Sequence, residues 1–584
     1  MDSTLQQRAE ATARLYADPH NPLLHLDRGR VHEQLGYADL AAADAYRALT
    51  LFESVVDPDG CEFLARRRKN VSEKETGKDD EEEEDDEENF IPTSQEEYDS
   101  SIGDVYGLLV RSLVRCGCLR DAYEFCLRGM NLLAEGGNDL VKEATGLKEE
   151  MEKIKRISNI QEQRRGRRGN SADANGEAGK EVELDPTALN AQGYARRVLY
   201  PWNEHEPDRK ATDTLQLLNG RLGDVAPKCE VRAVALPALH DNDSSSSSKK
   251  DTLDGIESEE VSIQLGLFAK EDIAPGEIIL RETSLLTATN RLHDDLCDAC
   301  NGPLPELSSE NPPVACEECD DTIFCGQECH DRAQEVYHAA VCGQEGLESI
   351  GKDIPDPKDK ADYLYLLLLG RAIAMAATQD VHPLELPEVK YIWGDFHDLS
   401  SSSTTTSSSA IAAEQSLPWE SDPTSTLPFS FQLSILQPMR ILEEMGLDPF
   451  ATLSLYDTWV LNTLYAKFRG TASGRLSTWD GGPEVCAVHP LWCLANHSCD
   501  PNVRWEWGAE ITFMARTTEE RAMWKEKDGQ ETRRNRGGIK KDEEILNHYC
   551  DIGLSVKKRR EWAKGALGGV CLCERCLWEA SLEE

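Results

Sequence analysis

The sequence is poor in basic residues. It has 63 Lys and Arg against 107 Asp and Glu, so its formal net charge at pH 7 is −44. The ten consecutive acids from Asp79 to Glu88 account for only part of this charge, and −34 remains without them. This charge disfavours direct binding of nucleic acid. It would attract a basic partner such as a lysine-rich protein segment, although it also serves solubility.

Long apolar runs are also missing. The longest, Tyr363 to Ala377, is too short to cross a bilayer and contains Arg371, so it predicts a buried helix. The first residues, Met1 to Arg8, contain no apolar core of the kind that signal peptides have. We therefore expect an intracellular protein, in the cytoplasm, the nucleus or both, without a membrane role. In that reducing environment the 19 cysteines favour metal sites over disulfides.

At 584 residues the chain should form several domains. Residues 1–165 have the apolar periodicity of helices. Two stretches share one spacing of small residues, which is similar to the tetratricopeptide pattern: Gly36, Ala41 and Ala48, then Gly117, Ala122 and Gly129. The tryptophan and terminal proline of that pattern are absent, so a peptide-binding repeat groove and a generic helical bundle both stay open. An acidic insertion near residues 73–95 should be a disordered loop.

Residues 166–227 read as a linker and docking segment, in which Tyr200 to Asn203 should lie against the catalytic unit. The basic run Arg164 to Arg168, at the end of a long polar helix, is either a nuclear address or solvated charge. The stretch from Cys229 to Leu236 alternates like an edge strand. Trp505 to Phe513 reads as a hairpin that turns at Gly508.

Eight cysteine and histidine residues within 46 positions have the spacing C-x2-C-x15-C-x2-C-x5-C-x3-C-x8-H-x3-C. Zinc takes four thiolate or imidazole ligands tetrahedrally, and so short a segment needs metal to fold. All ligand positions are filled by protein, which indicates a structural role and not hydrolysis. The eight predicted ligands are Cys297, Cys300, Cys316, Cys319, Cys325, Cys329, His338 and Cys342.

Four further elements follow one another along the chain: Gly266-Leu267-Phe268, the run Asn496 to Asn502, Glu543-Glu544-Ile545 with Tyr549, and Cys571-x-Cys573-x2-Cys576. Together with the eight-ligand cluster they resemble the SET-and-MYND-domain branch of the SET-domain protein-lysine methyltransferases. This resemblance covers about residues 228–577.

The resemblance implies a multidomain α+β chain with an α-helical, repeat-like N-terminal region. Its β-rich SET core would be split by a MYND zinc finger and a helical insert, and a cysteine-rich post-SET segment would follow. The expected boundaries are 228–296 for the first part of the SET domain, 297–342 for the finger, 343–480 for the helical insert with a Ser/Thr-rich loop, 481–551 for the catalytic core and 552–584 for the post-SET segment.

The resemblance also implies the metal pairing. In the finger, Cys297, Cys300, Cys325 and Cys329 would hold one zinc ion, and the other four ligands a second. A third zinc ion would be held by Cys571, Cys573 and Cys576 with Cys499 as the fourth ligand. Such an ion would attach the C-terminal tail to the active centre.

The methyl donor implied by the family is S-adenosylmethionine, with Tyr549 as the catalytic residue. Gly266, Phe268, Asn496 and His497 would bind this cofactor. The sequence departs from the family pattern at Asp542, where a glycine is usual, and at Ala466-Lys467-Phe468, where many relatives have Asn-x-Phe.

We therefore expect a protein-lysine methyltransferase acting on histone or non-histone protein. Its substrate would be a lysine-bearing, basic protein segment, and the finger and the helical region could bind peptides. A zinc-stabilised adaptor with weak or no transferase activity is the alternative.

Overall fold

The structure, a computed structural model, describes residues 3–68, 90–135, 141–169, 184–196, 198–237, 261–290, 295–319, 322–351, 354, 360–394, 396, 426–477, 481–525, 532–567 and 569–583. Two compact units are present. Unit 1 comprises Met1–Val198 and Asp398–Trp459, and unit 2 comprises Leu199–His397 and Val460–Glu584. Most of the predicted acidic insertion, residues 170–183 of the predicted linker and the Ser/Thr-rich loop lie outside the described residues.

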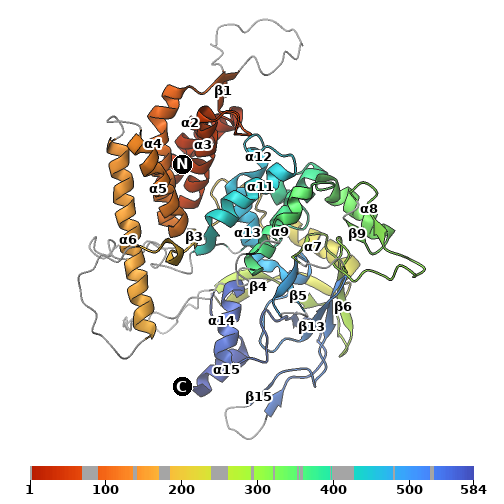
Figure 1. Ribbon diagram of the computed structural model, residues 1–584. Coiled ribbons are helices and arrows are strands. Elements are labelled where there is room, and N and C mark those ends of the chain that lie inside the picture. The colour runs from red at the N-terminus through yellow and green to blue at the C-terminus, as the bar shows by residue number, and fades with distance from the viewer. Residues whose placement is uncertain are drawn as a thin grey trace. The chain divides into compact units, whose positions relative to one another are not determined.

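Unit 1 is built on helices that stand side by side (Figure 1). Two helical hairpins form where the spacing of small residues predicted them, and each turns at a glycine in the left-handed region, Gly36 with φ 79° and Gly117 with φ 84°. Ser94 and Glu97 form a capping box before the second hairpin. The helices are α1 (Ser3–Ala17), α2 (Pro22–Gln34), α3 (Ala38–Val56), α4 (Gln95–Cys116), α5 (Leu119–Glu135) and α6 (Val141–Gly169).

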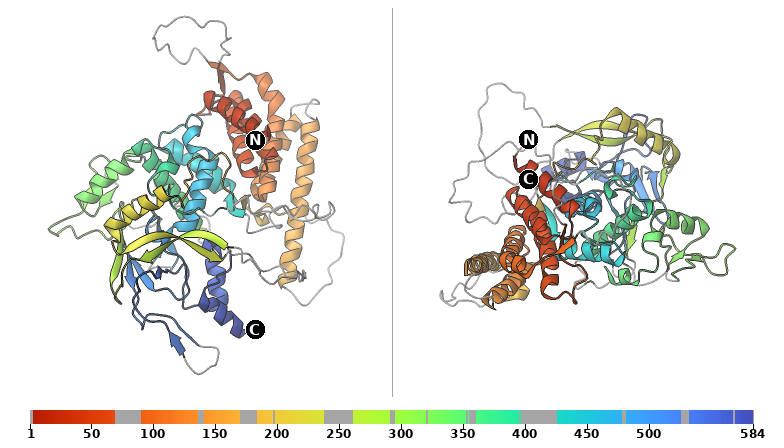
Figure 2. Two further views of the ribbon diagram at one scale, coloured as in Figure 1. Left: turned by 180° about the vertical axis from the view of Figure 1, so that it is seen from behind. Right: turned by 90° about the horizontal axis from the view of Figure 1, so that it is seen from above.

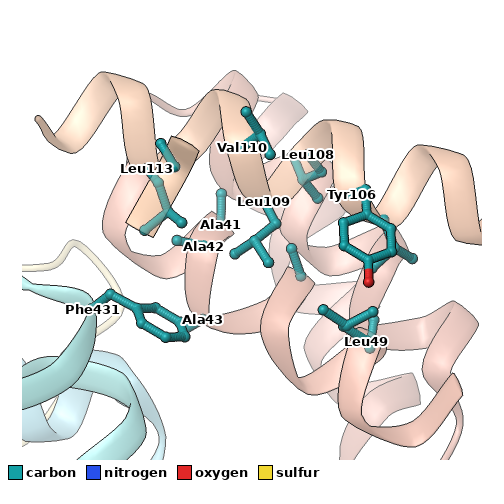
Figure 3. Packing of buried hydrophobic residues seen from close by; sticks show 14 of the residues in the cluster. Ala41, Ala42, Ala43, Leu49, Tyr106, Leu108, Leu109, Val110, Leu113 and Phe431 are labelled. Atoms are coloured by element: carbon teal, nitrogen blue, oxygen red, sulfur yellow. The ribbon is translucent and has the colours of Figure 1, made fainter. Parts of the chain in front are cut away.

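Small side chains let the helices of unit 1 approach closely. Ala41, Ala42 and Ala43 of α3 are fully buried against leucines of α4, as Figure 3 shows. A Cβ atom added to Gly29 would lie 2.9 Å from Leu108 Cδ2, so this position has no room for a larger residue. Phe431 comes from a distant part of the chain and reaches the same core.

The segment that carries Phe431 belongs to unit 1. That unit takes in residues 398–459, which lie within the predicted insert 343–480. Long-range strand pairing holds the described part of this segment there: β10 (Thr426–Ser430) is antiparallel to β3 (Gln192–Arg196). Unit 1 also contains β1 (Arg66–Arg68) paired with β2 (Phe90–Pro92), a π-helical turn over Gln432–Leu436, α11 (Gln437–Glu444), α12 (Leu453–Tyr456) and the start of α13 (Thr458–Thr471).

A buried group of charges ties the same segment to the helical hairpins. Arg28 is fully buried and donates to Asp44 of α3 and, at 2.7 Å, to Asp457. Arg47 donates to the hydroxyl of Thr458 at 3.0 Å. Burial is the largest single influence on the pKa of Asp44 and would raise it. The charges and hydrogen bonds of Arg28 and His32 together outweigh burial and hold that pKa below its usual range.

Unit 2 contains three small antiparallel sheets with strand orders β17-β5-β4, β13-β14-β6 and β11-β12-β7. β4 and β5 form a long ribbon (Figure 2) in which β4 is the edge strand, as the sequence predicted. The hairpin at Gly508 is also confirmed. The strands are β4 (Cys229–Pro237), β5 (Val261–Ala269), β6 (Ile278–Glu282), β7 (Thr287–Thr289), β11 (Ser473–Leu476), β12 (Pro483–Ala487), β13 (Val503–Trp507), β14 (Ile511–Ala515) and β17 (Glu544–Ile545).

The two predicted halves of the core interleave. β6 and β7, which precede the cysteine cluster, pair with β14 and β12, which follow the helical insert. Residues 228–296 and 481–551 thus contribute strands to the same sheets. Shorter strand pairs lie outside these sheets: β8 (Val314–Ala315) with β9 (Ile323–Phe324), and β15 (Met523–Lys525) with β16 (Thr532–Arg534).

The remaining helices of unit 2 are α7 (Thr212–Val225), α8 (Gln327–Val336), α9 (Lys360–Gln379), α14 (Val556–Leu567) and α15 (Glu574–Glu583). Within the described residues, α9 alone is long and apolar enough to span a membrane by length and composition. However, 61% of its most apolar window is buried inside the protein, and it packs on β7 and β12. This is the buried helix that the sequence predicted for Tyr363 to Ala377.

Candidate functional site

Two distant segments run side by side at the centre of unit 2 and bring the predicted site residues together. The backbone N–H of Asn547 donates to Asn496 O, and that of Ser498 donates to Asn547 O, both at 2.8 Å. His497 and Asn547 form a parallel bridge. This pairing places the run 495–502 directly beside 544–549, although about 50 residues separate them in the sequence.

Asn496 lies between β5 and β17. Its side-chain Nδ2 donates to Leu265 O at 3.0 Å and to Glu544 Oε1 at 2.7 Å. Burial raises the pKa of Glu544, and the hydrogen bond from Asn496 opposes this shift. Gly266 makes the arrangement possible, because a Cβ there would lie 2.7 Å from Glu544 Oε1 and 3.2 Å from Asn496 Nδ2.

Phe268 projects from β5 next to the same pair. It is opposite Glu544 in the register of β5 and β17, and the guanidinium of Arg232 lies 5.1 Å from its ring centroid. Arg232 also donates to Asp542 Oδ1 at 2.6 Å. Asp542 has φ 64°, so the aspartate adopts the left-handed conformation for which a glycine is usual.

His497 is held at both ring nitrogens. Its Nδ1 accepts the backbone N–H of Tyr549 at 3.0 Å, and its Nε2 lies 3.3 Å from Cys499 Sγ. Burial lowers the pKa of His497 to about 4, so the ring is neutral at pH 7. Because an N–H can only donate, the proton of this neutral ring lies on Nε2.

Tyr549 is held at its backbone and at its hydroxyl by two residues of one turn. The hydroxyl donates to Ala495 O at 3.0 Å, while the N–H bonds to His497. Burial raises the pKa of Tyr549 well above its usual range, with the charges of Cys493 and Glu544 acting in the same direction and Arg209 opposing them. The phenol is therefore protonated at neutral pH and can donate a hydrogen bond.

Two further residues of the run 496–502 fix its position through side-chain hydrogen bonds. Asn502 is buried; its Nδ2 donates to Glu544 O at 2.7 Å and its Oδ1 accepts from Leu546 N at 2.8 Å. The carboxylate of Asp500 accepts from Arg521, Trp524 and Asn535, and thereby attaches the segment carrying β15 and β16.

The segment Tyr200 to Arg209 belongs to unit 2, where the sequence analysis expected Tyr200 to Asn203 to dock. Tyr200 accepts a hydrogen bond from Asn462 at 3.3 Å, and Glu206 pairs with the buried Lys467 at 2.8 Å. Lys467 is the central residue of Ala466-Lys467-Phe468 and also donates to backbone carbonyls of residues 389, 390 and 392. In this chain, Lys467 therefore joins buried segments of unit 2 through an ion pair and hydrogen bonds.

Among the described residues, three groups of four potential metal ligands occur, each with all ligand atoms within 4.8 Å of one another. Thiolates bound tetrahedrally at about 2.3 Å stand about 3.8 Å apart. Cys300 and Cys325, and likewise Cys316 and Cys342, have their Sγ atoms 3.8 Å apart, which fits zinc. The groups are Cys297, Cys300, Cys325 and Cys329; Cys316, Cys319, His338 and Cys342; and Cys499, Cys571, Cys573 and Cys576.

These three groups are the same sets that the sequence analysis expected. The third joins the site run to the C-terminal tail, since Cys499 Sγ lies 3.3 Å from Cys576 Sγ and 4.0 Å from Cys571 Sγ. A fourth group overlaps it and consists of His497, Cys499 and Cys550.

Sequence reasoning missed several residues of the site. Glu544, Asn502 and Asp500 lie inside the motifs that were recognised, so their positions were visible but their contacts were not. Cys550 directly follows Tyr549, and an unassigned cysteine beside a predicted catalytic residue was the available signal. Nothing in the sequence pointed to Arg209.

Residues 264–550 match the model described as "SET domain". Among solved structures, a similar one is the SET domain of LSMT bound to lysine and AdoHcy, with 14% sequence identity and a TM-score of 0.21. The alignment covers 49% of this chain and 47% of that one, so the chain spans about half the length of that structure's chain. The search of curated proteins found no match.

Proposed function

We propose that this protein is an S-adenosylmethionine-dependent protein-lysine N-methyltransferase, because its residues 264–550 match the SET domain. One observation carries the proposal. Residues from three separate segments lie together here. Asn496 donates to Glu544, the adjacent His497 accepts from the N–H of Tyr549, and Gly266 lies against the Asn496–Glu544 pair.

This group of residues has the features that binding of a small-molecule cofactor requires. Because residue 266 is a glycine, no side chain stands between its backbone and the Asn496–Glu544 pair, where a Cβ would collide with Glu544. Asn496 and Phe268 flank this position. Both hydrogens of the Asn496 amide are donated within the protein, so the groups left to face a cofactor are its Oδ1 and the aromatic ring. In this role Gly266, Phe268, Asn496 and His497 hold S-adenosylmethionine, whose sulfonium supplies an electrophilic methyl group for direct displacement by an amine.

Tyr549 would position the substrate amine. Its hydroxyl hydrogen is held by Ala495 O, so the oxygen is left to accept an N–H of the substrate amine and thereby turn the amine lone pair toward the methyl group. Alignment of two reacting groups lowers a barrier by about 7–11 kcal/mol. This makes Tyr549 a catalytic residue by orientation and not by proton abstraction.

The lysine substrate must lose a proton before it can attack. Its ordinary pKa of about 10.4 makes deprotonation at pH 7 cost roughly 5 kcal/mol. A buried site disfavours the ammonium form and lowers this cost. The positive charge of Arg209 lowers the pKa of Tyr549, and a positive charge near the amine disfavours the ammonium form as well.

Zinc would be structural. The ions held by the two finger groups would fold residues 297–342, a MYND-type finger in this proposal, and the third would attach the post-SET tail to the run 496–502. The charge of −44 fits a basic, lysine-bearing protein substrate. The finger and the tetratricopeptide-like hairpins would bind peptides. The protein would reside in the cytoplasm, the nucleus or both.

The first experiment measures S-adenosylmethionine binding to zinc-loaded protein by calorimetry, followed by transfer of labelled methyl to histones and to a cell lysate. Binding with transfer supports the enzyme. A folded, zinc-loaded chain that binds no S-adenosylmethionine rules the enzyme out and leaves the zinc-stabilised adaptor. Binding without transfer to either substrate pool likewise points to the adaptor.

A further inference from the structure

The ring of His497 connects two parts of the site that would otherwise be separate. On one side its Nδ1 accepts from Tyr549 N–H at 3.0 Å. On the other, its Nε2 lies 3.3 Å from Cys499 Sγ, a member of the tail metal group. Only one protonation pattern of a neutral ring satisfies the first contact, with the proton on Nε2 and directed to the sulfur.

This pattern decides between two roles for the histidine near zinc. His497, Cys499 and Cys550 could form a ligand set of their own. To bind zinc through Nε2, however, a neutral imidazole would need its proton on Nδ1, where it would face the N–H of Tyr549. The two hydrogens would then collide, so His497 fits as a hydrogen-bond donor to a zinc-bound thiolate and not as a ligand.

The strength of that donated bond depends on the metal. Zinc keeps Cys499 as a thiolate, which is a charged acceptor, and hydrogen bonds to charged groups are stronger than those to neutral ones. A free thiol is only a weak acceptor. Removal of zinc therefore loosens the ring of His497 at Nε2, and the ring is what holds the backbone of Tyr549 at Nδ1.

We propose that His497 is a positioning residue that transmits occupancy of the tail zinc site to Tyr549. The path runs from Cys499 Sγ through the imidazole to the N–H of Tyr549, whose hydroxyl is then aligned on Ala495 O. This inference rests on the proposed function for its catalytic meaning, but its contacts can be tested without methyl transfer.

Two substitutions separate the ends of the path. In His497→Asn, the side-chain oxygen takes the place of Nδ1 and keeps the acceptor for Tyr549, while the donor to Cys499 is lost. In His497→Gln, the side-chain nitrogen takes the place of Nε2 and keeps the donor, while the acceptor is lost. The neighbouring His548→Asn is the matched control, because the Nδ1 of that ring lies against Cys550 O and not against a metal-group sulfur.

The first readout is zinc release from the full-length, zinc-loaded protein to a chromogenic chelator. Cys573→Ser identifies which phase belongs to the tail ion. We expect His497→Asn to release that ion about 10- to 100-fold faster, as loss of a second-shell donor does, and His497→Gln and His548→Asn to release it at the wild-type rate. Equal rates in His497→Asn and wild type would overturn the proposal.

The second readout is amide hydrogen exchange at Tyr549, compared with Leu546, whose N–H is held by Asn502 and not by the ring. Cys573→Ser should speed exchange at Tyr549 and leave Leu546 unchanged. In the His497→Asn background the same change should have no further effect on Tyr549. An unchanged rate at Tyr549 in Cys573→Ser, or a fully additive effect in the double variant, would exclude the path.

These readouts keep the two proposals apart. If either His497 variant fails to fold, wild type and Cys573→Ser still decide the inference through exchange at Tyr549. A protein that binds no S-adenosylmethionine would lose the proposed function while the zinc-release and exchange results stood unaffected.

Discussion

The hydroxyl of Tyr549 donates a 3.0 Å hydrogen bond to the carbonyl oxygen of Ala495, so the phenol is aimed by the turn that also carries Asn496 and His497. Tyr549→Phe removes this anchor and the oxygen that accepts from the amine and orients it. We expect the rate of methyl transfer to fall about 100-fold or more, as it does when one preorganised hydrogen-bonding group is lost. Labelled-methyl transfer measures the rate, and calorimetry should show S-adenosylmethionine binding retained. A variant with wild-type transfer would remove Tyr549 from catalysis.

Gly266 has no space for a side chain. In Gly266→Ala the new Cβ would lie 2.7 Å from Glu544 Oε1, so the Asn496–Glu544 pair must shift. Overpacking of this kind costs about 1–3 kcal/mol, and we expect at least a tenfold weaker affinity for S-adenosylmethionine by calorimetry. Gly508→Ala is the control, since a Cβ there meets no atom within 4 Å. Equal affinities in both variants would contradict the placement of the cofactor at Gly266.

Asp542 adopts φ 64°, a conformation that glycine takes without strain. Its ion pair with Arg232 is largely exposed, and such pairs contribute about 0–1 kcal/mol. Asp542→Gly should therefore leave the free energy of unfolding within about 1 kcal/mol of wild type, because relief of backbone strain offsets the lost pair. Asp542→Val should be clearly less stable in thermal unfolding. Equal melting temperatures for the Gly and Val variants would show that the backbone conformation is different.

Asp457 neutralises Arg28 in the interior of unit 1. Asp457→Ala leaves a buried guanidinium without one of its two carboxylates, and breaking a buried pair costs about 3–5 kcal/mol. We expect a large fall in the thermal stability of the chain. In the control Asp27→Ala, the lost pairs with Arg14 and Arg30 are both exposed and should together cost no more than about 1 kcal/mol. A small effect at Asp457 would show that the C-terminal part of unit 1 is not anchored by this pair.

His25 is fully buried, and burial lowers its pKa to about 3 from an ordinary value of about 6.5. Below pH 6.5 the unfolded chain binds a proton that the folded chain does not. The contribution of His25 to the free energy of unfolding is therefore fully present above pH 6.5. It is lost as pH falls toward 3, by up to about 1.4 kcal/mol per pH unit.

Thermal unfolding of wild type and His25→Gln at pH 7.5 and pH 5 measures this contribution. The melting temperature should drop less on acidification in the variant. The same drop in both proteins would assign the acid sensitivity to other groups.

Much of the site could be predicted from the sequence because many of its residues occur in short motifs, only a few positions apart. The paired C-x2-C steps and the H-x3-C step place ligands on turns that the backbone closes locally, and the structure gathers the expected finger sets within 4.8 Å. Gly36 and Gly117 end helices because few other residues adopt φ near 80° without strain. The β13–β14 hairpin follows equally from alternation around a glycine.

By itself, the sequence determined which residue types stand at which spacing, and hence the helical hairpins, the finger ligands and the order of the site motifs. Only the tertiary structure decided which distant segments meet. It paired Asn496 with Glu544, brought Cys499 to the tail cysteines and assigned residues 398–459 to unit 1. Local spacing is set by bond geometry, whereas contacts across tens or hundreds of residues depend on strand register and on buried packing, which no single segment specifies.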